Sequence, residues 1–153
     1  MKALRHLLVC TAIALAVVTT RTAAAPLSPS CSIDASAPLS FGAYDVFAAT
    51  PLDSVAGLTV RCNHHQSASL GLSGLLASGM RSMAGQTSAL GYNIYANAVR
   101  SLVAGDGSFG ASPIYVNVNE HTGAMVYLYG RMPAGQDVPA GAYVATLLAT
   151  LNF

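Results

Sequence analysis

The chain has 153 residues, of which 53% are hydrophobic and only 8% are charged. Beyond residue 24 it holds four arginines, no lysine and six acidic residues, a formal charge of minus two. This charge excludes a nucleic-acid binder that works through phosphate contacts, because such proteins need clustered cations to displace counterions. A surface with so few charges must be covered by hydroxyl and amide groups or by another protein.

The first 24 residues have the three parts of a secretory signal peptide. A basic start is followed by a short apolar run and then by small residues up to Ala24. The apolar run, about twelve residues long, is too short to span a bilayer. We expect cleavage after Ala24 and a single domain over residues 25–153, which is long enough to bury a hydrophobic core.

Two cysteines, Cys31 and Cys62, remain after the signal peptide. In an oxidising compartment they are expected to form a disulfide, which constrains the unfolded chain by roughly 3 to 4 kcal/mol in the loop-entropy model. A zinc site that adds His64 and His65 is the alternative. Paired-ligand spacing is missing, and adjacent histidines in a strand point to opposite faces, so we predict the disulfide and no metal site.

After residue 30, short runs rich in Val, Leu, Tyr and Thr alternate with clusters of Gly, Pro, Asn and Asp. This pattern is typical of an all-β sandwich. We predict strands at residues 39–43, 57–62, 67–73, 90–97, 114–119, 124–129 and 143–152. In the second of these, alternation directs Leu58, Val60 and Cys62 inward, toward a partner strand that carries Cys31.

The last predicted strand has two largely apolar faces. Tyr143, Leu147, Leu151 and Phe153 share one face, and the other is only half polar. Such a strand is typical of a sheet interior, with neighbours on both sides. An immunoglobulin-like sandwich supplies a following strand at this point, and none follows in this sequence. We therefore expect an incomplete immunoglobulin-like β-sandwich that lacks its final strand.

A sheet without its final strand exposes unpaired backbone groups and a slot into the core. A strand donated by another chain fills such a slot through main-chain hydrogen bonds and alternate side chains. If four or five side chains enter, at about 1.5 to 3 kcal/mol each, the donor strand stabilises the domain by roughly 6 to 15 kcal/mol. The predicted donor-strand groove is bordered by Tyr143, Leu147, Leu151 and Phe153, with Leu39 and Phe41 on the opposite edge.

An ordered set of motifs runs through residues 25–153. It comprises Cys31-x-Ile33, Phe41-Gly42-x-Tyr44-Asp45, Leu58-x-Val60-x-Cys62, Arg81-x-Met83, Tyr92-Asn93-Ile94-Tyr95, Gly105-Asp106-Gly107, Tyr129-Gly130-Arg131, Gly141-x-Tyr143 and Leu151-Asn152-Phe153. In this order the motifs resemble the spore coat protein U domain family, which includes subunits of archaic chaperone–usher pili. The resemblance covers essentially the whole segment and implies an incomplete immunoglobulin-like fold completed by a strand from another chain.

The resemblance also implies a function and partners. We expect a secreted structural or adhesive subunit of a chaperone–usher surface fibre, assembled by donor-strand complementation and used in adhesion and biofilm formation. The implied partners are a periplasmic chaperone, an outer-membrane usher and other pilus subunits, with no cofactor and no enzymatic activity. The implied location, reached through the periplasm, is the cell surface, an extracellular fibre or a spore coat. The alternative is a self-contained spore-coat or cell-surface protein that does not polymerise by strand exchange.

The segment before Cys31 departs from the family pattern. Pilus subunits of this type carry an N-terminal donor extension, whereas residues 25–30 reach at most about 20 Å when extended. Pro26 and Pro29 cannot donate ladder hydrogen bonds. We therefore expect a subunit that accepts a strand and gives none, as a fibre tip does.

Three patterns invite comparison with the motifs of enzyme, cofactor or metal sites. Residues 105–110 spell the dinucleotide fingerprint G-x-G-x-x-G, but Pro113 follows where that motif requires a helix, so we interpret the segment as a loop. Ser73 lacks the spacing of a nucleophile elbow. The histidines include no H-x-H pair of the kind seen in copper-binding β-sandwiches. None of these patterns supports a catalytic assignment.

Two surface hypotheses stay open at this stage. Leu75, Leu76 and Met80 form either an exposed, adhesive hydrophobic loop or side chains that tuck into the sandwich. A group of tyrosines also provides a candidate sugar-stacking platform. Alternation places Tyr92 and Tyr95 on opposite strand faces, so some of these rings are expected in the core. The four tyrosines are Tyr92, Tyr95, Tyr127 and Tyr129.

Overall fold

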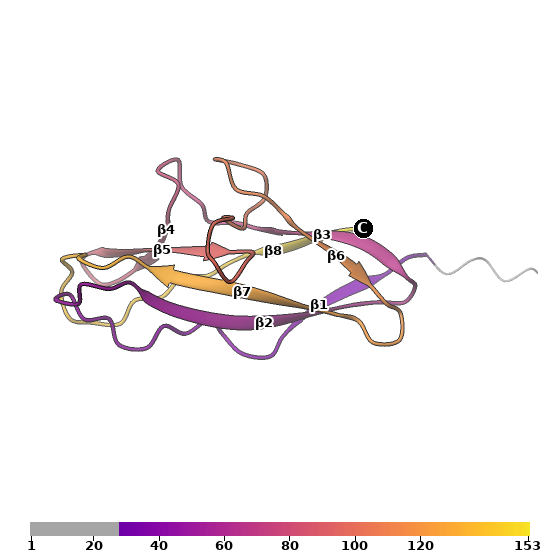
Figure 1. Cartoon of the computed structure of the whole chain (residues 1–153), viewed down its shortest axis with the longest axis horizontal. Helices are drawn as coiled ribbons and strands as arrows, with labels where there is room; N and C mark the ends of the chain where they lie inside the picture. The colour runs from indigo at the N-terminus through magenta and orange to yellow at the C-terminus, as the bar shows by residue number, and fades with distance from the viewer. Residues whose placement is uncertain (1–27) are drawn as a thin grey trace, which may run out of the picture.

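The computed structural model describes residues 28–153, so the predicted signal peptide lies outside the described range. Within this range the chain is all β, as predicted, and contains no helix that could cross a membrane. Figure 1 shows an elongated molecule whose long strands run along its longest axis. The strands are β1 (Cys31–Ala35), β2 (Leu52–Cys62), β3 (Gln66–Leu72), β4 (Arg81–Ala84), β5 (Ala89–Tyr95), β6 (Ile114–Val118), β7 (Ala124–Met132) and β8 (Ala149–Asn152).

The strands form two antiparallel sheets. One has five strands in the order β1-β2-β7-β5-β4, and the other has three in the order β6-β3-β8. Inward residues of both sheets form one hydrophobic core. β1 and β8 are therefore edge strands, one in each sheet, and β8 pairs with β3 alone within residues 28–153. One side of the C-terminal strand is thus left unpaired by residues 28–153, which agrees with the expected sandwich that lacks its final strand.

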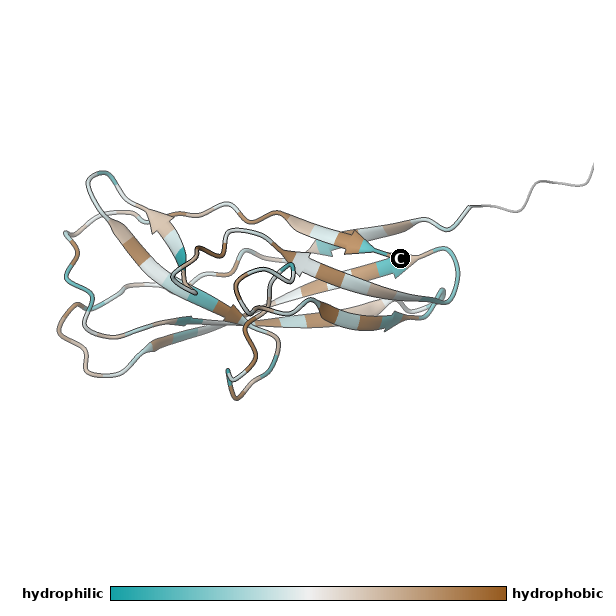
Figure 2. Cartoon of the chain, turned by 90° about the horizontal axis from the view of Figure 1, so that it is seen from above, coloured by the Kyte–Doolittle hydropathy of each residue, from teal (hydrophilic) through white to brown (hydrophobic). Residues whose placement is uncertain are grey.

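Strand alternation builds the core. Leu58, Val60 and Cys62 of β2 are buried, which confirms the inward face predicted for this strand. Leu70 and Leu72 of β3 meet them from the other sheet. Figure 2 shows the same alternation as hydrophobic and paler bands along the strands. Burial of each such side chain stabilises the fold by about 1.5–3 kcal/mol.

The predicted disulfide is present. Cys31 lies opposite Cys62 in the β1–β2 ladder, and the two sulfur atoms are bonded. The partner strand inferred for Cys62 is therefore β1, a short strand that was not among the predicted elements. The disulfide joins an edge strand, which has one neighbour, to the long strand β2.

Two predicted strands are wrong in whole or in part. Residues 39–43 form no strand, because Pro38 cannot donate to a ladder and Gly42 adopts a left-handed φ of 75°. Of residues 143–152, only Ala149–Asn152 is a strand. Residues 143–148 leave the edge of one sheet and reach the edge of the other.

Strand β4 was not predicted from the sequence, because its first residue, Arg81, is charged and yet points inward. The side chain is only 1% exposed, and burial lowers its pKa. Its Nε donates to the Ser73 carbonyl at 3.0 Å, and its Nη2 donates to the carbonyls of Leu72 and Ala104 at 3.2 and 2.7 Å. These bonds fix the end of β3 to the start of the loop that follows Ala104. An arginine at an inward position interrupts the alternation of apolar and polar residues from which a strand is predicted.

The G-x-G-x-x-G segment is a loop, as interpreted from its sequence. Gly107 and Gly110 adopt φ values of 101° and 80°, which favour glycine. The Asp106 carboxylate accepts a hydrogen bond from the Ser108 backbone N–H at 3.0 Å. Hydrogen bonding by Ser108 lowers the pKa of Asp106. The segment leads into strand β6, so it lacks the helix that a dinucleotide site requires.

Candidate functional site

A long groove opens between the two sheets on the side of the edge strands β1 and β8. Its volume is about 1170 Å³. One wall is formed by residues 35–47, which continue from β1, and the other by residues 138–149, which lead into β8. The base is formed by Ala56, Leu58, Leu72, Met83, Leu90, Tyr92, Leu128 and Met132. Because the base is apolar and Asp45 is the one charged lining residue among 28–153, the groove suits apolar side chains.

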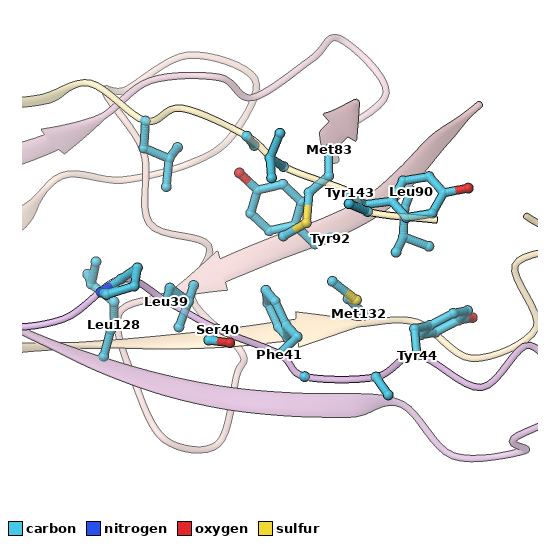
Figure 3. A pocket seen from close by; sticks show the side chains of 18 of the residues that line it. Leu39, Ser40, Phe41, Tyr44, Met83, Leu90, Tyr92, Leu128, Met132 and Tyr143 are labelled. Atoms are coloured by element: carbon cyan, nitrogen blue, oxygen red, sulfur yellow. The ribbon is translucent and has the colours of Figure 1, made fainter. Parts of the chain in front are cut away.

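The first wall packs on a glycine in β7. A Cβ atom at Gly130 would lie only 2.6 Å from Phe41 Cζ and 3.0 Å from Leu39 Cδ2. The Phe41 ring also meets the Tyr92 ring edge-on, with centroids 6.0 Å apart. Figure 3 shows Leu39 and Phe41 on one side of the groove, and Tyr143 with Met83 and Leu90 on the opposite side. Because Gly130 has no side chain, Leu39 and Phe41 can pack directly against the backbone of β7.

Hydrogen bonds hold the far end of the first wall. The Tyr44 hydroxyl donates to the Pro133 carbonyl at 2.8 Å and accepts from the Gln136 N–H at 2.9 Å. The Gln136 side chain in turn accepts from the Gly91 N–H at 2.7 Å and donates to the Gly91 carbonyl at 2.9 Å. This side chain therefore pairs with the backbone of β5 as a neighbouring strand would.

The second wall is anchored by Tyr143. The Tyr143 ring covers Gly85, where an added Cβ would lie 2.5 Å from Cε1. Its hydroxyl donates to the Pro139 carbonyl at 2.8 Å and lies 2.7 Å from Ser88 Oγ. Ala84 and Val144 exchange two backbone hydrogen bonds of 2.8 and 3.1 Å. This end of the wall is thus attached to the five-stranded sheet at β4.

The same wall then attaches to the three-stranded sheet. The Ser73 N–H donates to the Leu148 carbonyl at 3.0 Å, and the Leu148 N–H donates to Ser73 Oγ at 3.0 Å. Leu147 and Ala149 line the groove, whereas Leu148 does not line it and is 67% exposed. Val144 borders the groove and is 70% exposed. The alternation read from the sequence therefore describes this segment even where it is not a strand.

The structure brings together four of the six residues predicted for the groove. Leu39, Phe41, Tyr143 and Leu147 line it. Leu151 instead packs against the hydrophobic core, and Phe153 lies half exposed beyond β8. Sequence reasoning missed the small residues of the walls, such as Ala37 and Ala142, because alanine carries no distinctive pattern.

The three residues of the predicted adhesive loop do not share an exposed surface. Leu75 is buried, and Met80 packs over Gly91 on the outer face of β5. Leu76 alone is exposed. Leu75 and Met80 therefore agree with the alternative, in which these side chains pack against the sandwich, and Leu76 does not.

The tyrosines divide as alternation predicts. Tyr92 is in the core, whereas Tyr95, Tyr127 and Tyr129 lie on the outer face of the five-stranded sheet. Arg100 lies over the Tyr129 ring, with its Cζ 6.0 Å from the centroid. The four rings therefore do not form one sugar-stacking platform. Only Tyr95, Tyr127 and Tyr129 share a face of the sheet.

The fold and the groove together define a class of protein, an immunoglobulin-like sandwich that is open along its edge strands. The sequence profile of the Spore Coat Protein U domain family matches residues 17–150. The chain belongs to this family, which confirms the resemblance read from its motifs.

A solved structure has a similar fold. It is the crystal structure of the CsuC–CsuE chaperone–tip adhesion subunit pre-assembly complex from archaic chaperone–usher Csu pili of Acinetobacter baumannii. The sequences are 21% identical, with a TM-score of 0.52 over 82% of this chain and 40% of that chain. At this identity the likeness concerns the fold, and this chain spans less than half the length of that one. Comparison with curated protein sequences finds no match.

Proposed function

We propose that this protein is a structural or adhesive subunit of a chaperone–usher surface fibre, and that its groove accepts a β-strand from another chain. The observation that carries the proposal is the open apolar groove between residues 35–47, which continue from edge strand β1, and residues 138–149, which lead into edge strand β8. Edge strands present unpaired backbone groups, and a strand placed between them satisfies those groups on both sides.

The energetics favour occupation of the groove. Core residues such as Leu58, Leu90 and Leu128 line its base. A donor strand that inserts four or five apolar side chains gains roughly 6 to 15 kcal/mol. That range equals the whole stability of a typical domain, about 5 to 15 kcal/mol. The empty domain is therefore expected to be barely stable and to depend on its donor.

The proposed partners follow from this need. A periplasmic chaperone lends a strand after export, an outer-membrane usher exchanges it, and another subunit supplies the strand in the assembled fibre. Family membership and the likeness to a subunit solved with its chaperone support this order. The resulting location is the cell surface, and the role is structural rather than catalytic.

We further propose a terminal, tip-like position in the fibre. Pro26 and Pro29 in the segment before Cys31 each lack the N–H that a donor strand contributes to a ladder. The similar solved structure is that of a complex between a chaperone and a tip adhesion subunit. A subunit that accepts a strand but donates none ends its fibre.

Periplasmic expression with and without a candidate chaperone tests the proposal. Native mass determination of the purified protein is expected to give a one-to-one complex when the chaperone is present. Without it, the yield of soluble protein should fall sharply. A soluble monomer of high thermal stability, obtained without any partner, would instead support the self-contained surface protein and refute strand acceptance.

A further inference from the structure

A second hollow lies on the outer face of the five-stranded sheet. Its volume is about 350 Å³, and its lining residues are Pro51, Met80, Asn93, Tyr95, Arg131, Pro133 and Ala134. Asn93 and Arg131 are register partners on β5 and β7, and Tyr95 is two residues further along β5 on the same face. Small-ligand pockets begin at about 300 Å³, so the hollow has room for one small molecule.

A cluster of charged side chains with a net positive charge borders the hollow. Arg131 Nε and Nη2 donate to the two carboxylate oxygens of Asp53 at 2.7 and 2.8 Å, and Arg100 Nε lies 3.3 Å from the same carboxylate. The hydrogen bond from Arg131 lowers the pKa of Asp53, which keeps this carboxylate ionised at neutral pH. Arg131 lines the hollow, whereas Asp53 and Arg100 lie beside it. Two guanidinium groups share one carboxylate, so this cluster has a net charge of plus one. A ligand with one negative charge complements it.

The hollow also contains an unpaired hydrogen-bond acceptor. Asn93 is 9% exposed, and its Nδ2 donates to the Gly79 carbonyl at 2.8 Å. This bond sets the orientation of the amide, because the flipped form would place two oxygen atoms together. Asn93 Oδ1 accepts no hydrogen bond from residues 28–153. A ligand that donates a hydrogen bond to Asn93 Oδ1 removes the free-energy cost of leaving this buried acceptor unpaired.

The remaining walls are apolar and in part adaptable. Pro51, Pro133 and the Tyr95 ring present flat carbon surfaces, which suit the C–H faces of a sugar ring. Met80 lines the hollow and packs over Gly91. An unbranched thioether side chain moves easily, so Met80 can give a ligand access to Asn93.

We propose that this hollow binds a sugar acid, such as a uronic or sialic acid residue of a surface glycan. Arg131 Nε and Nη2 bind Asp53, so the sugar carboxylate pairs with the other edge of the planar guanidinium, formed by Nη1 and the second hydrogen of Nη2. A sugar hydroxyl donates to Asn93 Oδ1, and the ring lies against Tyr95. An acetate-like anion lacks the hydroxyl donor, and a neutral sugar leaves the positive charge unmatched, so a ligand with both groups fits best. The hollow and the groove lie on opposite faces of the sheet, so the inference does not rest on the proposed function.

The test measures binding of defined probes by NMR and calorimetry to the exported chain, purified with any partner that keeps it soluble. The probes are methyl glucuronide, N-acetylneuraminic acid, methyl glucoside and acetate. At least one of the two sugar acids is expected to bind tenfold or more tightly than methyl glucoside and acetate. Arg131→Gln is expected to weaken that binding by about tenfold or more, since it removes a charge-assisted pair.

Two further variants complete the test, one in the hollow and one control outside it. Asn93→Asp replaces the amide with a carboxylate that repels the ligand, and it should abolish binding without depending on the Arg131 variant. Arg61→Gln removes an exposed arginine of β2 outside the hollow and should leave binding unchanged. Equal binding of all four probes, no binding of either sugar acid, or unchanged binding by both hollow variants would overturn the proposal. Selective binding of an acidic peptide such as acetyl-Asp-Gly-Glu would also overturn it, because the site would then belong to a protein partner.

Discussion

Replacement of Leu147 by aspartate tests the strand-acceptor groove most directly, because the next residue provides a matched control. Leu147 lines the groove, and its Cδ2 lies 3.6 Å from the position that a Cβ at Gly74 would take. Leu148 belongs to the same wall but points outward and is 67% exposed. Leu147→Asp and Leu148→Asp therefore introduce the same charge on opposite faces of one segment.

The expected difference between the two variants is large. Leu147 is already partly buried in the empty domain, so a donor strand that covers it gains up to about 1 kcal/mol from burial of the remainder. A carboxylate at the same position loses that gain and adds a desolvation cost of several kcal/mol. The sum is about 4 kcal/mol, which corresponds to a thousandfold weaker capture of the strand. Leu148→Asp changes an exposed side chain and should alter capture less than threefold.

Copurification with a tagged chaperone gives the first readout, and fluorescence anisotropy with a labelled donor-strand peptide gives the affinity. Circular dichroism of both variants, recorded with the chaperone present, checks that they fold. Equal capture of the two aspartate variants would refute the assignment of Leu147 to the groove. Loss of capture in Leu148→Asp alone would place the strand on the outer face instead.

Three further predictions concern stability. The Cys31→Ser, Cys62→Ser double variant should lower the free energy of unfolding by about 3 to 4 kcal/mol in urea denaturation, and an unchanged midpoint would contradict the role of the disulfide at β1. Arg81→Met should lower it by about 3 kcal/mol, because buried carbonyl groups lose their donors, and a neutral result would mean that relaxation or water replaces those bonds. The exposed pair of Asp53 with Arg131 should contribute at most about 1 kcal/mol. Since pairing lowers the pKa of Asp53, this contribution is present above about pH 4 and is lost as the pH falls further, so Asp53→Asn should differ from the parent at pH 7 and match it near pH 2.

Local alternation determined much of the sandwich. The inward faces of β2 and β5 follow from a period of two, which depends only on neighbouring residues. The pairing of Cys31 with Cys62 followed from the absence of any other cysteine beyond the predicted signal peptide. The outward direction of Leu148 also followed from alternation, although most of residues 143–152 do not form a strand.

Contacts between distant segments decided the rest. Residues 39–43 looked like a strand, yet they have no ladder partner and instead pack their side chains over Gly130. β4 was hidden because Arg81 is buried, and its hydrogen-bond acceptors lie on other segments of the chain.

The sequence by itself thus determined that this protein is an all-β sandwich of the spore coat protein U type, with one disulfide and an apolar C-terminal segment. Only the tertiary structure decided where the groove opens and that Arg131, Asn93 and Tyr95 share a hollow. The physical reason is that strand alternation acts between neighbours along the chain. A groove or a hollow is instead formed by side chains that approach one another only after the sheets have paired.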